Sequence, residues 1–378
     1  MVAPFSFHVS DWSPRTLVLP ASLLGRHRTV GGGERYALEY ARAMAAMTPT
    51  TLGLFDLKAS AEPDGPLEIR TFSVRHLSFR WGFPATPETW RALAAYDVVH
   101  CMCFPTSLSE AVVPLARWRR QLSVLTDVGG GGGTWSGYMM KIHRRLDLHR
   151  LAHGLAHLSG HASTFFPDWK QPSTVLFGGA RPEIYPPGGP GGYALFVGRL
   201  LPHKGIRQVI DALTPDLPLR VVGRPYSPAY LQELRSAAVG KDVTFITDAS
   251  DAEVATQMAG ASVVLQPSLP SPTAAGDKSE LLGLVALEGM AAGKPVIVTR
   301  TTSLPELVVD GVTGFIVPPH DLGAMRARIA SLVRDPELSR RMGGQAQAHV
   351  RANFAWSTVA RRGLEFYRAL AVRHGLIP

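Results

Sequence analysis

Cysteine is scarce in this chain. The 378 residues contain two cysteines, Cys101 and Cys103, one residue apart in an otherwise apolar stretch. Two cysteines cannot build a disulfide framework, and so low a number is typical of a reducing compartment. A Cys-x-Cys pair can bind a metal, but no second Cys/His pair occurs at the spacing of a zinc site. We therefore expect two small core thiols, no metal site and no cofactor.

Long apolar runs are also missing. No window reaches the ~18 apolar residues that a membrane-spanning helix needs, and the most promising run, 281–292, is interrupted by Glu288. The first 16 residues include His8, Asp11 and Arg15, where a signal peptide requires a continuous apolar segment. The sequence therefore predicts a cytoplasmic protein, with peripheral contact at the inner membrane face as an open alternative.

Charged residues make up only 18% of the chain and hydrophobic residues 46%, which excludes a disordered polyelectrolyte and a coiled coil. Lysine and arginine exceed aspartate and glutamate by 39 to 30. This excess is spread evenly, with +5 in residues 1–185 and +4 in residues 186–378, so we expect no nucleic-acid partner. Local basic clusters at 117–120 and 141–150 fit either a solvated helix face or an anionic membrane surface.

Short apolar segments alternate with helical patterns, which predicts an α/β protein with parallel sheets and right-handed crossovers. At about 100–200 residues per domain, the length argues for two doubly wound domains. The Pro/Gly-rich segment 182–192 separates an N-terminal domain at 1–185 from a second domain at 186–355. Strands are expected at 16–20, 97–101, 122–126, 193–197, 217–222, 243–247, 262–266, 295–299 and 314–317. Helices are expected at 34–47, 107–120, 206–213, 230–238, 252–258, 284–292, 322–334, 336–352 and 356–372.

Glycine-rich turns follow two of the expected strands. The glycines 31–33 precede a helix, where the backbone can approach a phosphate or a sugar hydroxyl closely; a plain flexible turn is the alternative. The run 129–133 allows the same close approach, or a mobile lid. Neither segment has the spacing G-x-G-x-x-G, so a dinucleotide site is disfavoured.

Charged side chains mark the second half. Arg199 and Lys204 lie around a turn between a strand and a helix, and a planar guanidinium with an ammonium suits a diphosphate. Glu280 and Glu288 flank the start of the helix expected at 284–292. Carboxylates accept pairs of hydroxyl hydrogen bonds, so these two suit a polyhydroxylated ligand.

The segment 279–298, with Leu304-Pro-Glu306-Leu-Val and residues 311–319, closely resembles family 4 of the retaining glycosyltransferases, which have the GT-B fold. The resemblance extends to residues 32–35, to Val197-Gly-Arg199, to Lys204-Gly205 and to the closing Phe354-Ala-Trp356. It spans the chain and is densest from 193 to 356. It implies two Rossmann-like domains that face each other across a cleft, with a C-terminal helix, 356–378, that returns to the N-terminal domain.

The resemblance also implies residue roles. Arg199 and Lys204 would bind the diphosphate of a nucleotide-sugar, Glu288 the ribose and Glu280 the transferred sugar. The other donor-binding positions are Gly32, Gly33, Arg224, Thr247, Leu282, Gly283, Leu284 and Val285.

The chain departs from the family at one point. Many relatives carry a Thr-x-His-Gly pattern near the reacting carbon, where this chain has Thr126-Asp127-Val128-Gly129. Either Asp127 takes over the contact with sugar or acceptor, or that role is absent. Asp127 thus joins Arg199, Lys204 and Glu280 as a catalytic candidate, and Asp127 and His100 are the acceptor-binding candidates.

The expected reaction is transfer of a hexosyl group from a UDP- or GDP-sugar to an acceptor hydroxyl, with retention at the anomeric carbon. The acceptor can be a glycan, a lipid-linked or a small molecule. No Asp-x-Asp motif occurs, so cationic side chains are expected to replace a divalent metal. Three alternatives stay open: a sugar-nucleotide epimerase of GT-B architecture, a phosphorylase, and a non-catalytic basic protein that binds membrane surfaces.

Overall fold

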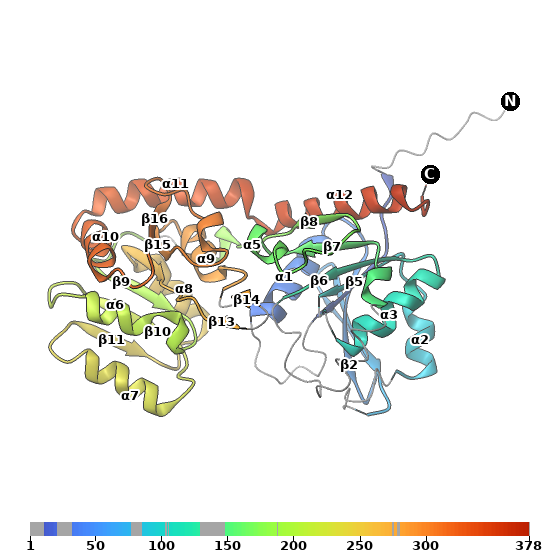
Figure 1. Cartoon of the computed structure of the whole chain (residues 1–378), viewed down its shortest axis with the longest axis horizontal. Helices are drawn as coiled ribbons and strands as arrows, with labels where there is room; N and C mark the ends of the chain where they lie inside the picture. Colours follow the sequence, from blue (N-terminus) through green and yellow to red (C-terminus); the bar gives the residue numbers. More distant parts are fainter. Residues whose placement is uncertain are drawn as a thin grey trace. The chain divides into compact units, whose positions relative to one another are not determined.

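The computed structural model describes residues 11–20, 32–76, 85–102, 104, 106–128, 148–186, 188–273, 276–277 and 280–377. The chain forms two compact units. The first unit comprises residues 1–158, 166–177 and 356–378, and the second comprises 159–165 and 178–355. In Figure 1 the C-terminal helix α12, drawn in red, therefore belongs with the blue and green part of the chain.

The first unit is built on an eight-stranded sheet in the order β3-β4-β2-β1-β5-β6-β7-β8. All strand pairs are parallel except β3 with β4. Its strands are β1 (Thr16–Pro20), β2 (Thr50–Asp56), β3 (Ser60–Asp64), β4 (Leu67–Ser73), β5 (Val98–Met102), β6 (Leu122–Thr126), β7 (Gly154–His157) and β8 (Ser173–Val175). Its helices are α1 (Gly32–Ala45), α2 (Pro87–Leu93), α3 (Ser107–Trp118), the 3-10 turn η2 (Leu148–Leu151) and α12 (Trp356–Arg373).

The central strands β1, β5 and β6 are buried at every residue, as expected for a parallel sheet covered on both faces. Leu17, Val99 and Leu125 lie in one hydrophobic cluster with residues of α3. Helix α12 packs on α1, where the rings of Tyr36 and Trp356 lie edge to face at 5.4 Å. The prediction that the last helix returns to the N-terminal domain is confirmed.

The second unit contains a six-stranded, all-parallel sheet in the order β11-β10-β9-β12-β15-β16. Its strands are β9 (Ala194–Val197), β10 (Leu219–Val222), β11 (Val243–Ile246), β12 (Val263–Gln266), β15 (Val296–Thr299), β16 (Gly314–Val317) and the small hairpin β13 (Pro272–Thr273) and β14 (Gly276–Asp277). Its helices are α5 (Gly160–Ser163), α6 (Ile206–Ala212), α7 (Pro228–Ala237), α8 (Asp251–Gly260), α9 (Leu284–Ala291), α10 (Leu322–Arg334) and α11 (Pro336–Asn353). Its 3-10 turns are η3 (Pro182–Ile184), η4 (Pro202–Lys204) and η5 (Leu304–Glu306).

Local signals explain where these helices begin. Ser227 and Ser250 cap α7 and α8, and the Ser250 cap is reciprocated by Glu253 three residues later. Asp335 caps α11, whose first residue is a proline. The apolar faces of α6 and α10 then bury against the sheet in a single hydrophobic cluster. Both units are thus α/β layers around parallel sheets, as predicted.

The border between the units differs from the predicted one at 185/186. It lies at 177/178, and segment 159–165 belongs to the second unit. A carboxylate holds this segment, because Glu306 accepts hydrogen bonds from the backbone N–H groups of Gly160 and His161 at 2.7 Å each. The Pro/Gly-rich segment lies within the second unit, where the buried Lys294 donates to the carbonyls of Gly188 and Gly189.

Candidate functional site

The carboxyl ends of the parallel strands gather the predicted donor-binding residues at one edge of the second unit's sheet. Neighbouring strands β9 and β10 end in Gly198 and Gly223, which approach so closely that a Cβ on Gly223 would lie 1.8 Å from the Gly198 carbonyl oxygen. Arg199 and Arg224 follow these glycines, and both are exposed. Thr247 follows β11 at the same edge and is half-buried.

Glycine is required at the turn that presents Lys204. Gly205 has φ +73°, and a Cβ there would lie 1.9 Å from the carbonyl oxygen of Pro267, directly after β12. The N–H of Leu269 donates to the carbonyl of His203 at 2.7 Å. Backbone contacts therefore hold the η4 turn against the end of β12, with Lys204 between them.

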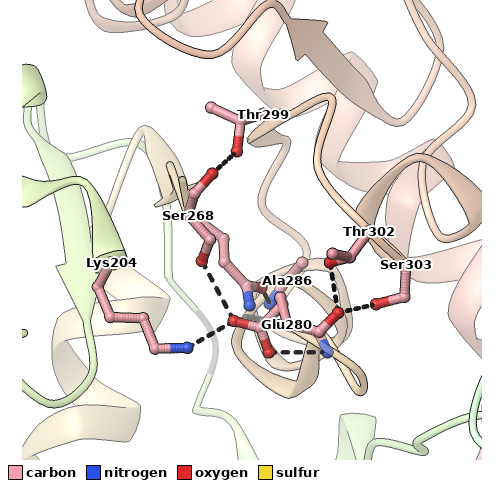
Figure 2. Close-up of polar contacts among 9 residues, drawn as sticks. Lys204, Ser268, Glu280, Ala286, Thr299, Thr302 and Ser303 are labelled. Carbon is pink, nitrogen blue, oxygen red and sulfur yellow. Dashed lines mark hydrogen bonds and ion pairs between the residues drawn. The ribbon is translucent and has the colours of Figure 1, made fainter. Parts of the chain in front are cut away.

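An ion pair forms the centre of this edge. The Nζ atom of Lys204 lies 2.6 Å from Oε2 of Glu280, and Figure 2 shows the two side chains pointing toward each other from different segments. Glu280 is only 9% exposed. The same oxygen accepts from the Ser268 hydroxyl at 3.2 Å, and Oε1 accepts from the N–H of Gly283 at 3.3 Å.

These contacts set the charge of the carboxylate. Burial by itself raises the pKa of Glu280, but the Lys204 ammonium, the Gln266 side chain and the Gly283 N–H outweigh it, so the pKa lies below its usual value. Glu280 is therefore ionised at neutral pH. An ionised carboxylate is acceptor-only, the state that suits sugar hydroxyls.

A layer of small polar residues fixes Glu280 in place. The Glu280 carbonyl accepts from the hydroxyls of Thr302 and Ser303, and the Ser268 carbonyl accepts from the Thr299 hydroxyl. Gln266 Oε1 accepts from the N–H of Ala286 at 2.8 Å. The sequence predictions missed these residues; the available signal is their position at strand ends β12 and β15, the edge that binds ligands in such sheets.

Helix α9 begins at this edge. Gly283 precedes it with φ +59°, and a Cβ there would lie 2.3 Å from Leu307, so the sharp entry into the helix needs glycine. Leu282 is buried, whereas Leu284 and Val285 in the first turn and Glu288 in the second are half-buried. The structure thus brings together the predicted residues of the second unit around the start of α9 and the ends of β9 to β12.

The other predicted residues belong to the first unit. Gly32 and Gly33 are the first residues of α1, and a Cβ on Gly33 would lie 3.1 Å from the side chain of Val128. Asp127, which directly follows β6, is only 6% exposed. Burial lowers the pKa of His157 on the neighbouring strand β7, and the Asp127 charge opposes this shift. Gly33 and the Asp127–Val128 turn therefore meet at the carboxyl edge of the first sheet.

His100 does not fit its predicted contact with an acceptor. It is fully buried on β5, and both ring nitrogens are already used: Nδ1 lies 2.6 Å from the Tyr367 hydroxyl and Nε2 lies 2.7 Å from the Thr126 hydroxyl. Burial lowers the pKa of His100 to about 3, so the ring is neutral. The sequence pattern could not reveal this, because the partner Tyr367 is 267 residues away.

The basic clusters are only partly described. Arg117, Trp118 and Arg120 are exposed at the end of α3, whereas Arg119 donates to the carbonyl of Trp90 at 2.8 Å. Residues 141–147 of the second cluster lie outside the described residues, as do Gly31, Cys103, residues 129–133 and Ser279. In the described part of the chain, none of the helices is long and apolar enough to cross a membrane.

Sequence comparison finds glycosyltransferases that are similar to part of this chain. Residues 184–349 match the sequence model of the family "Glycosyl transferases group 1". The D-inositol 3-phosphate glycosyltransferase of Corynebacterium glutamicum is 34% identical over 185 residues, which are 46% of this chain and 42% of that protein. Glycogen synthase of Mycobacterium tuberculosis is 29% identical over 188 residues, which are 48% and 43% of the two chains. The alignments thus span less than half of these curated relatives.

Solved structures share the fold over nearly the whole chain. HepE of Anabaena, in complex with UDP and glucose, is 20% identical with a TM-score of 0.69 over 94% of this chain and 99% of that one. Sucrose-phosphate synthase of Thermosynechococcus elongatus is 21% identical with a TM-score of 0.69 over 95% and 100%. Both are GT-B glycosyltransferases. The chain therefore has the GT-B fold, and its residues 184–349 are similar to the group 1 glycosyltransferases.

Proposed function

We propose that the protein transfers a hexosyl group from a nucleoside-diphosphate sugar to an acceptor hydroxyl, with retention at the anomeric carbon and without a metal ion. The observation that carries this proposal is the ion pair between Lys204 and the buried Glu280 at the carboxyl edge of the second sheet, inside the segment that matches the family. The names of the relatives favour sugar transfer over the epimerase and the non-catalytic alternatives.

The diphosphate is the leaving group, so the protein has to stabilise the negative charge that develops on it. Arg199 and Lys204 supply the cations in our proposal. Arg199 is exposed on the turn after β9 and free to form a fork with phosphate oxygens, while Lys204 is held by its 2.6 Å contact with Glu280. A fixed ammonium needs little reorganisation when the leaving group departs, which favours transition-state stabilisation.

The sugar, ribose and base take the remaining positions. Glu280 offers an ionised, buried carboxylate to the hydroxyls of the transferred sugar, beside the backbone of Gly283. Glu288, on the second turn of α9, would accept from the ribose hydroxyls. Arg224 and Thr247, at the ends of β10 and β11, would contact the base. UDP-sugars are the first donors to test, because HepE was solved with UDP and glucose.

The acceptor side belongs to the first unit in our proposal. Gly32 and Gly33 would approach the donor phosphates, and Asp127 would contact sugar or acceptor in place of the family histidine. Retention would follow from attack on the face that the leaving group departs from, within an ion pair. The donor sugar and the acceptor class, whether glycan, lipid-linked or small molecule, are to be found by experiment.

A peripheral membrane contact is part of the proposal on the partner side. Trp118 is 79% exposed at the end of α3, between the exposed Arg117 and the arginines Arg119 and Arg120. An exposed tryptophan flanked by arginines suits an anionic membrane surface. We expect the protein to co-sediment with vesicles that contain phosphatidylglycerol, and Trp118→Ser to reduce this binding; equal binding to neutral vesicles would contradict the contact.

The test of the proposed function is acceptor-dependent release of nucleoside diphosphate. UDP- and GDP-sugars are first screened for thermal stabilisation and slow hydrolysis, and the stabilising donor is then offered with acceptor pools. Proton NMR of the product reports whether the anomeric configuration is retained, and EDTA tests the independence from metal. Conversion of the donor without any acceptor into another nucleotide-sugar would instead identify an epimerase.

A further inference from the structure

Four buried polar groups form a continuous hydrogen-bonded chain inside the first unit. It runs from the hydroxyl of Thr126 to His100 Nε2 at 2.7 Å, from His100 Nδ1 to the Tyr367 hydroxyl at 2.6 Å, and from there to the Tyr40 hydroxyl at 2.9 Å. All four side chains are 0% exposed. They come from β6, β5, α12 and α1, so the chain connects elements that are far apart in the sequence.

The neighbouring residues fit this chain closely. A Cβ on Gly363 of α12 would lie 2.0 Å from the Tyr40 hydroxyl oxygen, so that oxygen occupies the space left by the missing side chain. The rings of Tyr40 and Tyr367 lie edge to face with the His100 ring at 5.7 and 5.8 Å. Packing therefore leaves the rings little freedom to choose other partners.

One end of the hydrogen-bonded chain lies at the carboxyl edge of the first sheet, and the other lies two turns inside α1. Thr126 is the last residue of β6, directly before Asp127 and Val128. Tyr40 follows Gly33 by seven residues, which is two helical turns and places both on one face of α1, about 10 Å apart. The start of α1 in turn meets the end of β6, where Val128 lies against Gly33. β6 and α1 are thus linked twice: directly, where Val128 lies against Gly33, and indirectly, through the hydrogen-bonded chain. Together these contacts form a closed loop.

This loop is rigid because its members cannot exchange their partners for water. A buried donor or acceptor that loses its partner costs about 1–3 kcal/mol. The neutral His100 ring has one nitrogen that donates and one that accepts, so it can join two hydroxyls only in a fixed orientation. The chain of hydrogen bonds therefore restrains the spacing between α1 and β6.

We propose that His100 and Tyr367 are positioning residues that hold the Gly32–Gly33 start of α1 against the Asp127–Val128 turn. This inference rests on the proposed function, because it assigns the C-terminal helix α12 a role in placing the backbone that approaches the donor phosphates. His100 then acts through Thr126 and Tyr367 and touches neither sugar nor acceptor. The sequence analysis thus selected His100 as an acceptor-binding residue, whereas in our proposal it positions the backbone.

The first test is Tyr367→Phe, which removes the bridging hydroxyl and keeps the ring. Tyr193→Phe is the matched control, since Tyr193 is a buried tyrosine of the second unit whose hydroxyl donates to the Gln257 carbonyl at 2.8 Å. In Tyr367→Phe we expect the amides of 32–40 to exchange with deuterium about tenfold faster or more, and kcat to fall about tenfold or more, because small displacements near reacting groups are costly. The Kd for UDP rises by a smaller factor than kcat falls, since Arg199, Lys204 and Glu288 of the second unit make most of the proposed contacts with the nucleotide. Tyr193→Phe should leave the amide exchange at 32–40, kcat and the Kd for UDP unchanged.

A second variant separates positioning from plain stability. The all-apolar combination Tyr40→Phe, His100→Leu and Tyr367→Phe leaves few orphaned polar groups, and such replacements are often nearly neutral for folding. We expect this variant to regain most of the melting temperature lost by Tyr367→Phe while kcat stays low and exchange at 32–40 stays fast. Recovery of kcat together with stability would overturn the positioning role, as would unchanged exchange at 32–40 in Tyr367→Phe. A wild-type protein that transfers no sugar would overturn the proposed function. The exchange experiment would still decide whether the hydrogen-bonded chain fixes α1.

Discussion

Replacement of Gly205 by alanine tests whether the second unit presents Lys204 through a close backbone contact. Gly205 has φ +73°, a conformation that costs a residue with a side chain about 1–2 kcal/mol. In addition, the new Cβ would lie 1.9 Å from the Pro267 carbonyl oxygen, which is backbone and cannot rotate away. To reach an allowed contact of about 3 Å, the η4 turn has to move by roughly 1 Å away from the end of β12.

This movement has a predictable size and consequence. Overpacking of a tight site costs about 1–3 kcal/mol in addition to the strain in φ, so the free energy of unfolding should fall by roughly 2–5 kcal/mol. Lys204 is the adjacent residue, and its Nζ atom lies 2.6 Å from Glu280, so a shift of roughly 1 Å would stretch this contact beyond hydrogen-bond distance. We therefore expect Gly205→Ala to lose both stability and sugar transfer.

Gly240→Ala is the matched control. Gly240 lies in the same unit with φ +78°, but nothing lies within 4 Å of a Cβ at that position. Urea unfolding should show a loss of about 1–2 kcal/mol for this variant, and the transfer rate should be unchanged. If Gly205→Ala is as stable and as active as Gly240→Ala, the close contact does not position Lys204 and the reasoning is refuted.

Further predictions concern other charged residues of the second unit. Burial lowers the pKa of Lys294 to about 8. Between pH 8 and 9.5 the unfolded chain therefore binds more protons than the folded one, so the free energy of unfolding rises with pH. From pH 8 to 9.5, urea unfolding should show that the wild type gains about 1–2 kcal/mol more stability than Lys294→Met does. If the stability of both proteins changes equally with pH, the prediction is wrong. Glu306→Ala removes the carboxylate that caps Gly160 and His161, and should cost about 1–2 kcal/mol in the same assay, whereas an unchanged midpoint would mean that water replaces the cap. Glu280→Gln keeps the shape of the side chain but loses its charge, so transfer should fall at least tenfold, and a wild-type rate would exclude Glu280 from sugar binding.

The sequence predicts many of the alternating strands and helices of this fold well. The expected strands 16–20, 122–126 and 314–317 and the helix 322–334 match the observed bounds, because each is an apolar or amphipathic segment with clear ends. The second unit is predicted most completely, since every expected helix and strand there falls within a few residues of an observed one. Strand β3 was missed because Ser60-Ala-Glu-Pro-Asp64 is a polar, largely exposed edge strand without an apolar pattern.

The site is only partly visible in the sequence. Arg199, Lys204, Glu280 and Glu288 stand in motifs that point to a nucleotide-sugar, and the structure places them at one sheet edge. The hydroxyls of Ser268 and Ser303 that fix Glu280 come from separate loops, and their contacts depend on the order of the strands rather than on spacing in the sequence. The burial of His100 has the same cause, because the helix that covers it begins more than 250 residues later.

Acceptor-dependent release of nucleoside diphosphate by Lys204→Met tests the central claim most directly. Lys241→Met is the control, because Lys241 is a lysine of the same unit that precedes β11 and donates to the Ile210 carbonyl, away from the carboxyl edge. Removal of a group that stabilises developing charge typically costs about 10²–10³ in kcat. We predict a loss of this size for Lys204→Met and an unchanged rate for Lys241→Met. A Lys204→Met protein that transfers sugar at the wild-type rate would contradict the claim that this ion-paired edge binds the departing diphosphate.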